Sequence, residues 1–150
     1  MTQASVPSGG HRHARGRAEY SLPGRRVAWV DLWLFAPLAL PFFSEIYVAI
    51  ILSLHQVLGL SGALPGFAPF HWVFVNATGV LAVLWALARI RFPVRELVLA
   101  DAYGRICVAM LLVFWIWRGA TPVVGLFVLT ELAGALYVVW PRHPDRPARA

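Results

Sequence analysis

The chain has 150 residues, of which 59% are hydrophobic and 13% charged, and its mean hydropathy is +0.67. A soluble domain of this length cannot bury so much apolar surface, so the composition excludes one and predicts an integral membrane protein. The net charge is +6, from thirteen arginines, no lysine and seven acidic residues. Because the arginines flank apolar runs, we interpret the positive charge as a signal for orientation in the membrane, and we expect no nucleic-acid partner.

Residues 1–28 form the first predicted segment, a basic tail. They do not have the profile of a cleaved signal peptide, because about twenty-five polar or small residues precede the first apolar run. A segment so poor in apolar residues cannot bury enough surface to offset the entropy lost on ordering. We therefore expect a disordered tail that Arg25 and Arg26 hold near the bilayer surface.

Four apolar runs follow, and then a short C-terminal tail: residues 29–54, 70–87, 97–117, 121–140 and 141–150. A helix of about 20 residues crosses the hydrocarbon core of a bilayer, so each run predicts one span. None of the runs alternates apolar and polar residues, which favours helices over barrel strands. Pro37 and Pro41 should kink the first span, because each lacks a backbone donor. The predicted fold is all-α, an integral membrane four-helix bundle.

The arginines lie on one side of this predicted bundle. Five precede the first span, three lie between the second and third spans, and three follow the fourth, whereas the opposite connections hold only Arg118. Positively charged connections stay in the cytoplasm, so both termini are expected there. The predicted location is the cytoplasmic (inner) membrane of a bacterium, as a multi-pass protein. The lipid bilayer is the expected partner, and a homo-oligomer or a larger membrane complex is left open.

Each predicted span carries one polar residue near its middle. At about 1.5 Å per residue, Asn76 lies about 9 Å below the outer boundary, Glu45 about 14 Å, Glu131 about 15 Å and Arg105 about 18 Å. Polar groups are costly inside a bilayer, so they face the bundle interior and find partners there. These positions predict a polar layer near the middle of the membrane, with Asp101 one turn closer to the cytoplasm.

The polar layer has two interpretations. In the structural one, Arg105 pairs with Asp101, four residues earlier on the same helix, and with Glu131 on the next, antiparallel helix. Such buried pairs fix the register of membrane helices. In the functional one, Glu45 has no second cation to pair with, and an unpaired carboxyl can carry the protons of a proton-coupled carrier. Asn76 and Glu131 are further proton or substrate candidates.

The sequence contains no pattern typical of catalysis or of metal binding. Its single cysteine, Cys107, excludes a dithiol redox pair. His55 and His71 lie at span ends with a spacing that matches no metal-ligand pattern, and no nucleophile–base constellation is visible. We therefore expect no cofactor, no metal and no enzymatic activity. The predicted function is that of a small non-catalytic membrane protein; the alternative is a proton-coupled small-molecule transporter that uses Glu45.

About half of the chain, residues 72–139, resembles a known group of proteins. The helix "FVNATGVLAVLWALARIRFP", the aspartate–arginine helix "ADAYGRICVAMLLVFW" and the acid-bearing "VVGLFVLTELAGALYVVW" resemble the small four-span bacterial membrane proteins around the DoxX and BphX-like groups. The resemblance to DoxX implies a link to quinone-coupled sulfur oxidation in some relatives. It adds a second alternative, a quinone-linked redox accessory subunit, and it assigns no role to any residue of this chain.

Overall fold

The computed structural model describes residues 10–140, with side-chain surroundings from residue 22 onward, and every regular element in this part of the chain is a helix. The expectation of an all-α chain is confirmed for these residues. The five α-helices and two short 3-10 helices follow in this order: α1 (Gly10–Phe35), η1 (Ala36–Ala39), α2 (Pro41–Val57), α3 (Pro69–Arg91), α4 (Arg95–Trp117), η2 (Pro122–Val124) and α5 (Gly125–Val139).

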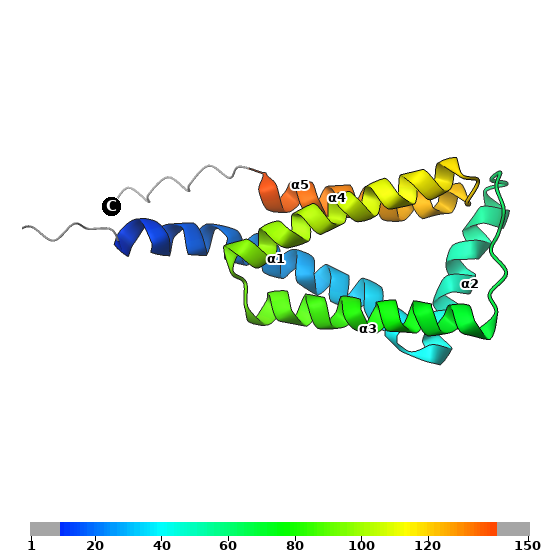
Figure 1. The fold of residues 1–150 in the computed structure, drawn as a ribbon, viewed down its shortest axis with the longest axis horizontal. Helices are drawn as coiled ribbons and strands as arrows, with labels where there is room; N and C mark the ends of the chain where they lie inside the picture. The colour runs from blue at the N-terminus through cyan, green and yellow to red at the C-terminus, as the bar shows by residue number, and fades with distance from the viewer. Residues whose placement is uncertain (1–9, 141–150) are drawn as a thin grey trace, which may run out of the picture.

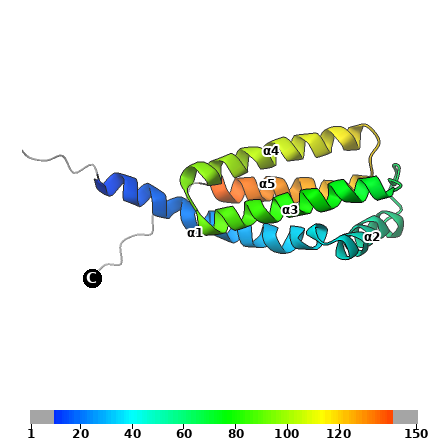
Figure 2. The same cartoon turned by 60° about the horizontal axis from the view of Figure 1, so that its bottom comes forward.

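Helices α1, α3, α4 and α5 lie lengthwise beside one another and form the bundle (Figures 1 and 2). α1 packs mainly along α3, and α4 packs along the antiparallel α5. Pro93 separates α3 from α4, because a proline disfavours helical geometry in the residue before it. We call the end of the bundle that carries Arg91 and Arg95 the arginine end. The opposite end, where α2 and η2 lie, is the turn end (Figure 1).

A sharp corner separates α1 from α2. The segment that ends with η1 and the helix α2 differ in direction by 108°. Pro37 and Pro41 lack the backbone donors that a continuous helix needs, and Leu40 between them is extended, with φ −110° and ψ 118°. The sequence predicts a kink at these prolines but one continuous span over residues 29–54. In the structure α2 instead turns across the turn end of the bundle (Figure 1).

Helix α3 holds this corner in place through one polar and one steric contact. The side-chain amide of Asn76 donates to the Leu38 carbonyl and to the Ser44 hydroxyl, both at 2.8 Å. One turn further along α3, a Cβ added at Gly79 would lie 2.3 Å from the Leu38 carbonyl carbon. The backbone of η1 therefore rests directly on α3, and only a glycine at residue 79 leaves room for it.

The described helices are built with small residues inside and large apolar residues outside. Much of the buried apolar set is alanine, whereas most of the phenylalanine, tryptophan and leucine side chains are exposed. Three helices are long and apolar enough to cross a membrane, namely α3, α4 and the stretch Pro122–Val139, and the bent pair of α1 and α2 makes a fourth if it counts as one span. This inverted distribution is typical of a multi-pass membrane protein, because lipid takes the place of an apolar core.

The first helix begins earlier than the sequence predicts. α1 runs from Gly10, and Val27 and Ala28 are already buried in the bundle, so the expected tail over residues 1–28 overlaps the first helix. The remaining parts of the expected tails, residues 1–9 and 141–150, lie outside the described residues. A Cβ added at Gly24 would lie 2.6 Å from Val98 Cγ2, so a glycine allows α1 to approach α4 closely here.

Candidate functional site

Five charged side chains meet inside the bundle and form what we call the charge cluster. They come from all four bundle helices, each is at most 8% exposed, and they are Asp31 (α1), Arg89 (α3), Asp101 and Arg105 (α4) and Glu131 (α5). A buried charge is costly unless it is paired and hydrogen-bonded, so these side chains depend on one another. The cluster therefore links the two helix pairs of the bundle.

Arg105 is the centre of the charge cluster. Its Nε donates to Asp101 Oδ2 at 2.9 Å, its Nη1 donates to Glu131 Oε2 at 3.0 Å, and its Nη2 pairs with the carboxylate of Asp31. The planar guanidinium presents its donors in a fixed fork, so one arginine can hold carboxylates from three directions. The structure thus brings Arg105 together with both expected partners, Asp101 and Glu131, and adds a third from α1.

Arg89 is the second cation of the cluster. Its Nη1 donates to Asp101 Oδ2 at 2.7 Å and its Nη2 pairs with Asp31. Its Nε is buried and has no hydrogen-bond partner among the described residues. The other oxygen of Asp101 accepts from the indole of Trp85 at 2.8 Å. Asp101 is therefore fully engaged, with three donors on its two oxygens.

The carboxylates of Asp31 and Glu131 are less completely engaged than that of Asp101. Asp31 accepts both guanidinium groups on Oδ2, and Glu131 accepts Arg105 on Oε2. Within the described residues, the second oxygen of each of these two carboxylates has no hydrogen bond. With three carboxylates and two guanidinium groups, the fully ionised cluster carries one net negative charge.

Gly134 on α5 makes room for the guanidinium of Arg105. A Cβ at this position would lie 2.9 Å from Arg105 Nη1 and 3.1 Å from its Cζ. On α4, Arg105 shares its helix face with the buried residues Ala102 and Ala109. Small residues on both helices therefore let the arginine reach across the α4–α5 interface to the acid on α5.

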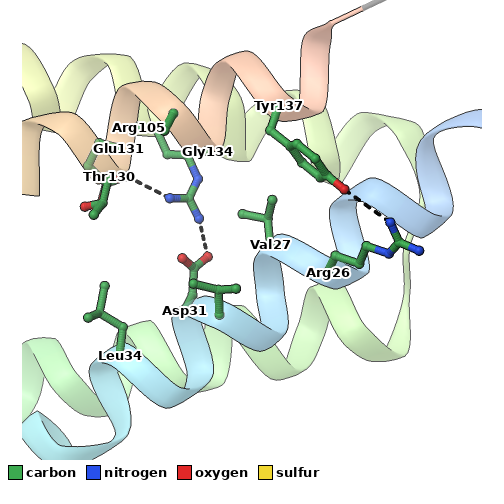
Figure 3. A pocket seen from close by; sticks show the side chains of 11 residues that line it. Arg26, Val27, Asp31, Leu34, Arg105, Thr130, Glu131, Gly134 and Tyr137 are labelled. Atoms are coloured by element: carbon green, nitrogen blue, oxygen red, sulfur yellow. Dashed lines mark hydrogen bonds and ion pairs between the residues drawn. The ribbon is translucent and has the colours of Figure 1, made fainter. Parts of the chain in front are cut away.

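A pocket of about 490 Å³ lies between α1 and α5, directly beside the charge cluster; we call it the α1–α5 pocket. Asp31, Arg105 and Glu131 line it, as Figure 3 shows. Most of the other lining side chains are apolar, among them Val30 and Leu34. The remaining lining residues are Arg26, Val27, Thr130, Ala133, Gly134 and Tyr137. The two carboxylates that keep an oxygen without a hydrogen bond are the two that line this pocket.

The arginine-end side of the α1–α5 pocket has a polar contact of its own. Arg26 Nη1 donates to the hydroxyl of Tyr137 at 3.4 Å, and this contact joins α1 to α5 (Figure 3). Arg26 is exposed, unlike the two arginines of the charge cluster. The pocket therefore has an exposed, cationic rim at one end, and the buried charge cluster, with its excess negative charge, lies further in.

The structure places two of the candidate residues outside the charge cluster. Glu45 lies on α2 and is exposed, because the corner after η1 turns α2 away from the bundle axis. The expected mid-membrane depth of Glu45 assumes a straight first span, and the burial on which its proton-carrier role depends is not observed. Asn76 is half-buried, and its amide braces the corner through Leu38 and Ser44.

Sequence reasoning missed Asp31 and Arg89 as members of the cluster. In the sequence Arg89 falls in a predicted connection, whereas in the structure α3 continues to Arg91 and the Arg89 side chain turns inward. The available signal is Asp31, an acid within the first apolar run, which needs a cation from another helix if it is buried. Which helix supplies that cation depends on the packing of α1 against α3.

Both histidines named in the sequence have structural contacts. His55 is buried, and its Nδ1 lies 2.7 Å from the hydroxyl of Thr121, which ties α2 to η2 at the turn end. His71 accepts a hydrogen bond from the Ala68 backbone at 2.9 Å at the start of α3. In the part of the chain that the structure describes, no group of three histidine, cysteine or acidic side chains is arranged to hold a metal ion.

Comparison with models of protein families, with curated proteins and with solved structures found no match for this chain. The resemblance to the DoxX and BphX-like groups stays a prediction from the sequence. The candidate site of this chain is the charge cluster, with its excess carboxylate, beside the largely apolar α1–α5 pocket.

Proposed function

We propose that this chain is a four-span protein of the bacterial cytoplasmic membrane with both termini in the cytoplasm. The support comes from charge and shape. Arg91 and Arg95 lie where α3 meets α4, at the arginine end, whereas Arg118 is the single arginine at the turn end among residues 10–140. Cytoplasmic connections hold the excess of arginine, so the arginine end faces the cytoplasm. In this arrangement α1 crosses the membrane and α2 lies along the outer surface.

Cysteine labelling in intact cells tests this orientation. In a Cys107→Ser background, a cysteine at Ser61 in the turn-end connection is expected to react with a membrane-impermeant maleimide. A cysteine at Glu96, in the first turn of α4, is expected to react only after permeabilisation. The reverse labelling pattern would overturn the proposed orientation, and labelling of both sites in intact cells would overturn the membrane-spanning arrangement of α4.

The same chain is proposed to be a binding protein, and not an enzyme, that holds an amphipathic molecule in the α1–α5 pocket. The observation that carries this proposal is the makeup of the pocket wall, which is almost entirely apolar and has carboxylates at one place. Ligand sites have this composition, because apolar walls supply affinity and a few polar groups fix orientation. A volume of about 490 Å³ accommodates a small molecule with an apolar body.

Photolabelling tests whether the pocket is occupied. A twelve-carbon alcohol with a diazirine in its chain is added to the protein in lipid nanodiscs, and labelled residues are mapped by mass spectrometry. We expect labelling of Val30, Leu34 and Ala133 above the level at Leu111, an exposed residue of α4 that measures ordinary contact with lipid. Equal labelling of all four positions would contradict the proposed function.

A filling substitution supplies the matched control. Ala133→Trp places an indole in the α1–α5 pocket and is expected to remove the excess labelling of Val30 and Leu34. Ala100→Trp adds the same side chain at an exposed position of α4 outside this pocket and should leave that labelling unchanged. If both variants behave alike, the labelled site is not the pocket.

A further inference from the structure

We infer that the ligand of the α1–α5 pocket is an organic cation with an apolar body, whose charged group binds between Asp31 and Glu131. This inference rests on the proposed function and adds the charge class of the ligand. It follows from three properties of the site: the charge balance of the cluster, the two carboxylate oxygens without hydrogen bonds, and the position of the pocket opening.

The charge balance of the cluster indicates the sign of the ligand's charge. The charge cluster holds three carboxylates against two guanidinium groups, and all five side chains are buried. A net charge away from water is costly unless a counter-charge lies beside it. One further positive charge completes the cluster, and Coulomb attraction in a poorly solvated site favours a cation there over a neutral group or an anion.

The hydrogen-bonding pattern gives the place where that charge binds. Asp101 is saturated by Trp85 and the two arginines. Asp31 and Glu131 each keep one oxygen without a hydrogen bond in the described part of the chain, and both residues line the pocket. They lie on α1 and α5 on either side of the Arg105 guanidinium, so an ammonium group in the pocket is offered one acceptor oxygen from each helix.

Beside Glu131, the Thr130 side chain offers a further acceptor, whereas Arg105 already occupies Glu131 Oε2. The hydroxyl of Thr130 donates to the Phe127 carbonyl at 2.9 Å, so its oxygen is left to accept a hydrogen bond. The nearest exposed cation of the pocket is Arg26, which lies at the other end, against Tyr137. An ammonium group therefore avoids Arg26 when it binds at the Glu131 end of the pocket.

The opening of the pocket indicates the route by which a ligand enters and the reason why its body is apolar. Val30 lines the pocket and is also 64% exposed on the outer surface of α1. The pocket therefore opens sideways, between α1 and α5, on a bundle surface covered with apolar side chains. In a membrane this opening faces lipid, so a ligand enters from the bilayer with its alkyl or aromatic part along Val30 and Leu34.

Three photoreactive probes with one chain and different headgroups test the inference. They are the twelve-carbon alcohol used above, the corresponding primary amine and the corresponding carboxylate. We expect the amine to label Leu34 and Ala133, relative to the lipid-facing Leu111, about tenfold more than the alcohol does, because a charge-assisted hydrogen bond contributes at least that factor. The carboxylate is expected to label these positions less than the alcohol.

Two matched glutamate variants test whether the preference for the amine probe depends on Glu131. Glu131→Gln keeps the size and one acceptor of the side chain but removes its charge, and it should abolish the preference for the amine while labelling by the alcohol persists. Glu45→Gln removes an exposed carboxylate on α2 and should leave the preference unchanged. Loss of the preference in the Glu45 variant, with retention in the Glu131 variant, would overturn the inference.

The outcomes separate the inference from the proposed function. If no probe labels the pocket above Leu111, the proposed function fails. If all three probes label it equally, the pocket binds amphiphiles but the inference of a cation fails. A preference for the carboxylate would also overturn the inference and would place the anchor at Arg26. The comparison of headgroups in the unchanged protein decides this even if the Glu131 variant does not fold.

Discussion

Removal of Arg105 is expected to destabilise the protein far more than removal of Glu131. Arg105→Leu takes away the group that contacts carboxylates of α1, α4 and α5, and it leaves Asp31, Asp101 and Glu131 with Arg89 as their only cation within the cluster. Glu131→Leu leaves two carboxylates and two guanidinium groups, and Arg105 keeps its contacts with Asp31 and Asp101. The first change increases the charge imbalance of the cluster, and the second removes it.

The expected magnitudes follow from this difference. Breaking a buried ion cluster by removing one central partner costs about 3–5 kcal/mol, because uncompensated charges stay buried. Loss of the single contact between Glu131 and Arg105, 3.0 Å long, costs about 1–2 kcal/mol, and relief of the negative excess offsets part of that cost. The two variants should therefore differ by about 2–3 kcal/mol in their free energy of unfolding, which is a factor of about 30 or more in the unfolding equilibrium.

Unfolding in mixed micelles by titration with dodecyl sulfate measures this difference, with tryptophan fluorescence as the signal from the seven tryptophans of the chain. Arg118→Leu at an exposed arginine of the α4–α5 turn serves as the control and should stay within about 0.5 kcal/mol of the unchanged protein. If Glu131→Leu costs as much as Arg105→Leu, Glu131 is not the excess carboxylate. If Arg105→Leu behaves like the control, the charge cluster does not form.

Three further substitutions and one control, Gly104→Ala, probe the corner and the edge of the charge cluster with the same unfolding assay. Gly79→Ala should cost about 2 kcal/mol or more of unfolding free energy, because its Cβ would lie 2.3 Å from the Leu38 carbonyl carbon. Gly104→Ala, in open space, should be neutral or slightly stabilising. Equal effects of the two substitutions would contradict the close approach of η1 to α3. Asn76→Ala should cost about 1–3 kcal/mol, because it removes two hydrogen bonds of 2.8 Å, and a neutral result would show that the corner does not need this brace. Trp85→Phe should cost about 1 kcal/mol by removing the indole donor of the cluster, and no change would mean that this 2.8 Å bond is absent in the membrane.

The features that the sequence predicts well are local ones. The positions of α3, α4 and α5 follow from apolar runs that end at arginine, proline and glycine. The contact between Arg105 and Asp101 follows from their spacing on one helix, and a short turn makes α4 and α5 antiparallel neighbours, which brings Glu131 within reach. Each of these inferences uses one helix or two consecutive helices, so no knowledge of the full packing is required.

The features that the sequence does not predict depend on contacts between distant helices. The prolines predict a bend after α1, but its size of 108° is set by Asn76 and Gly79, which lie on α3. Because that bend moves Glu45 to an exposed position, a depth estimate along a straight span cannot place it. In the same way, the inward turn of Arg89 depends on Asp31, which lies 58 residues earlier on another helix.

Solid-state NMR of the protein in lipid bilayers tests the central claim most directly, which is that the charge cluster joins the bundle helices within the membrane. With nitrogen-15 in arginine and carbon-13 in glutamate side chains, the account predicts a strong dipolar coupling between the Arg105 guanidinium and the Glu131 carboxyl carbon, as their 3.0 Å nitrogen–oxygen contact requires. The coupling should be absent in Glu131→Leu. A folded, lipid-embedded protein without this coupling would contradict the account.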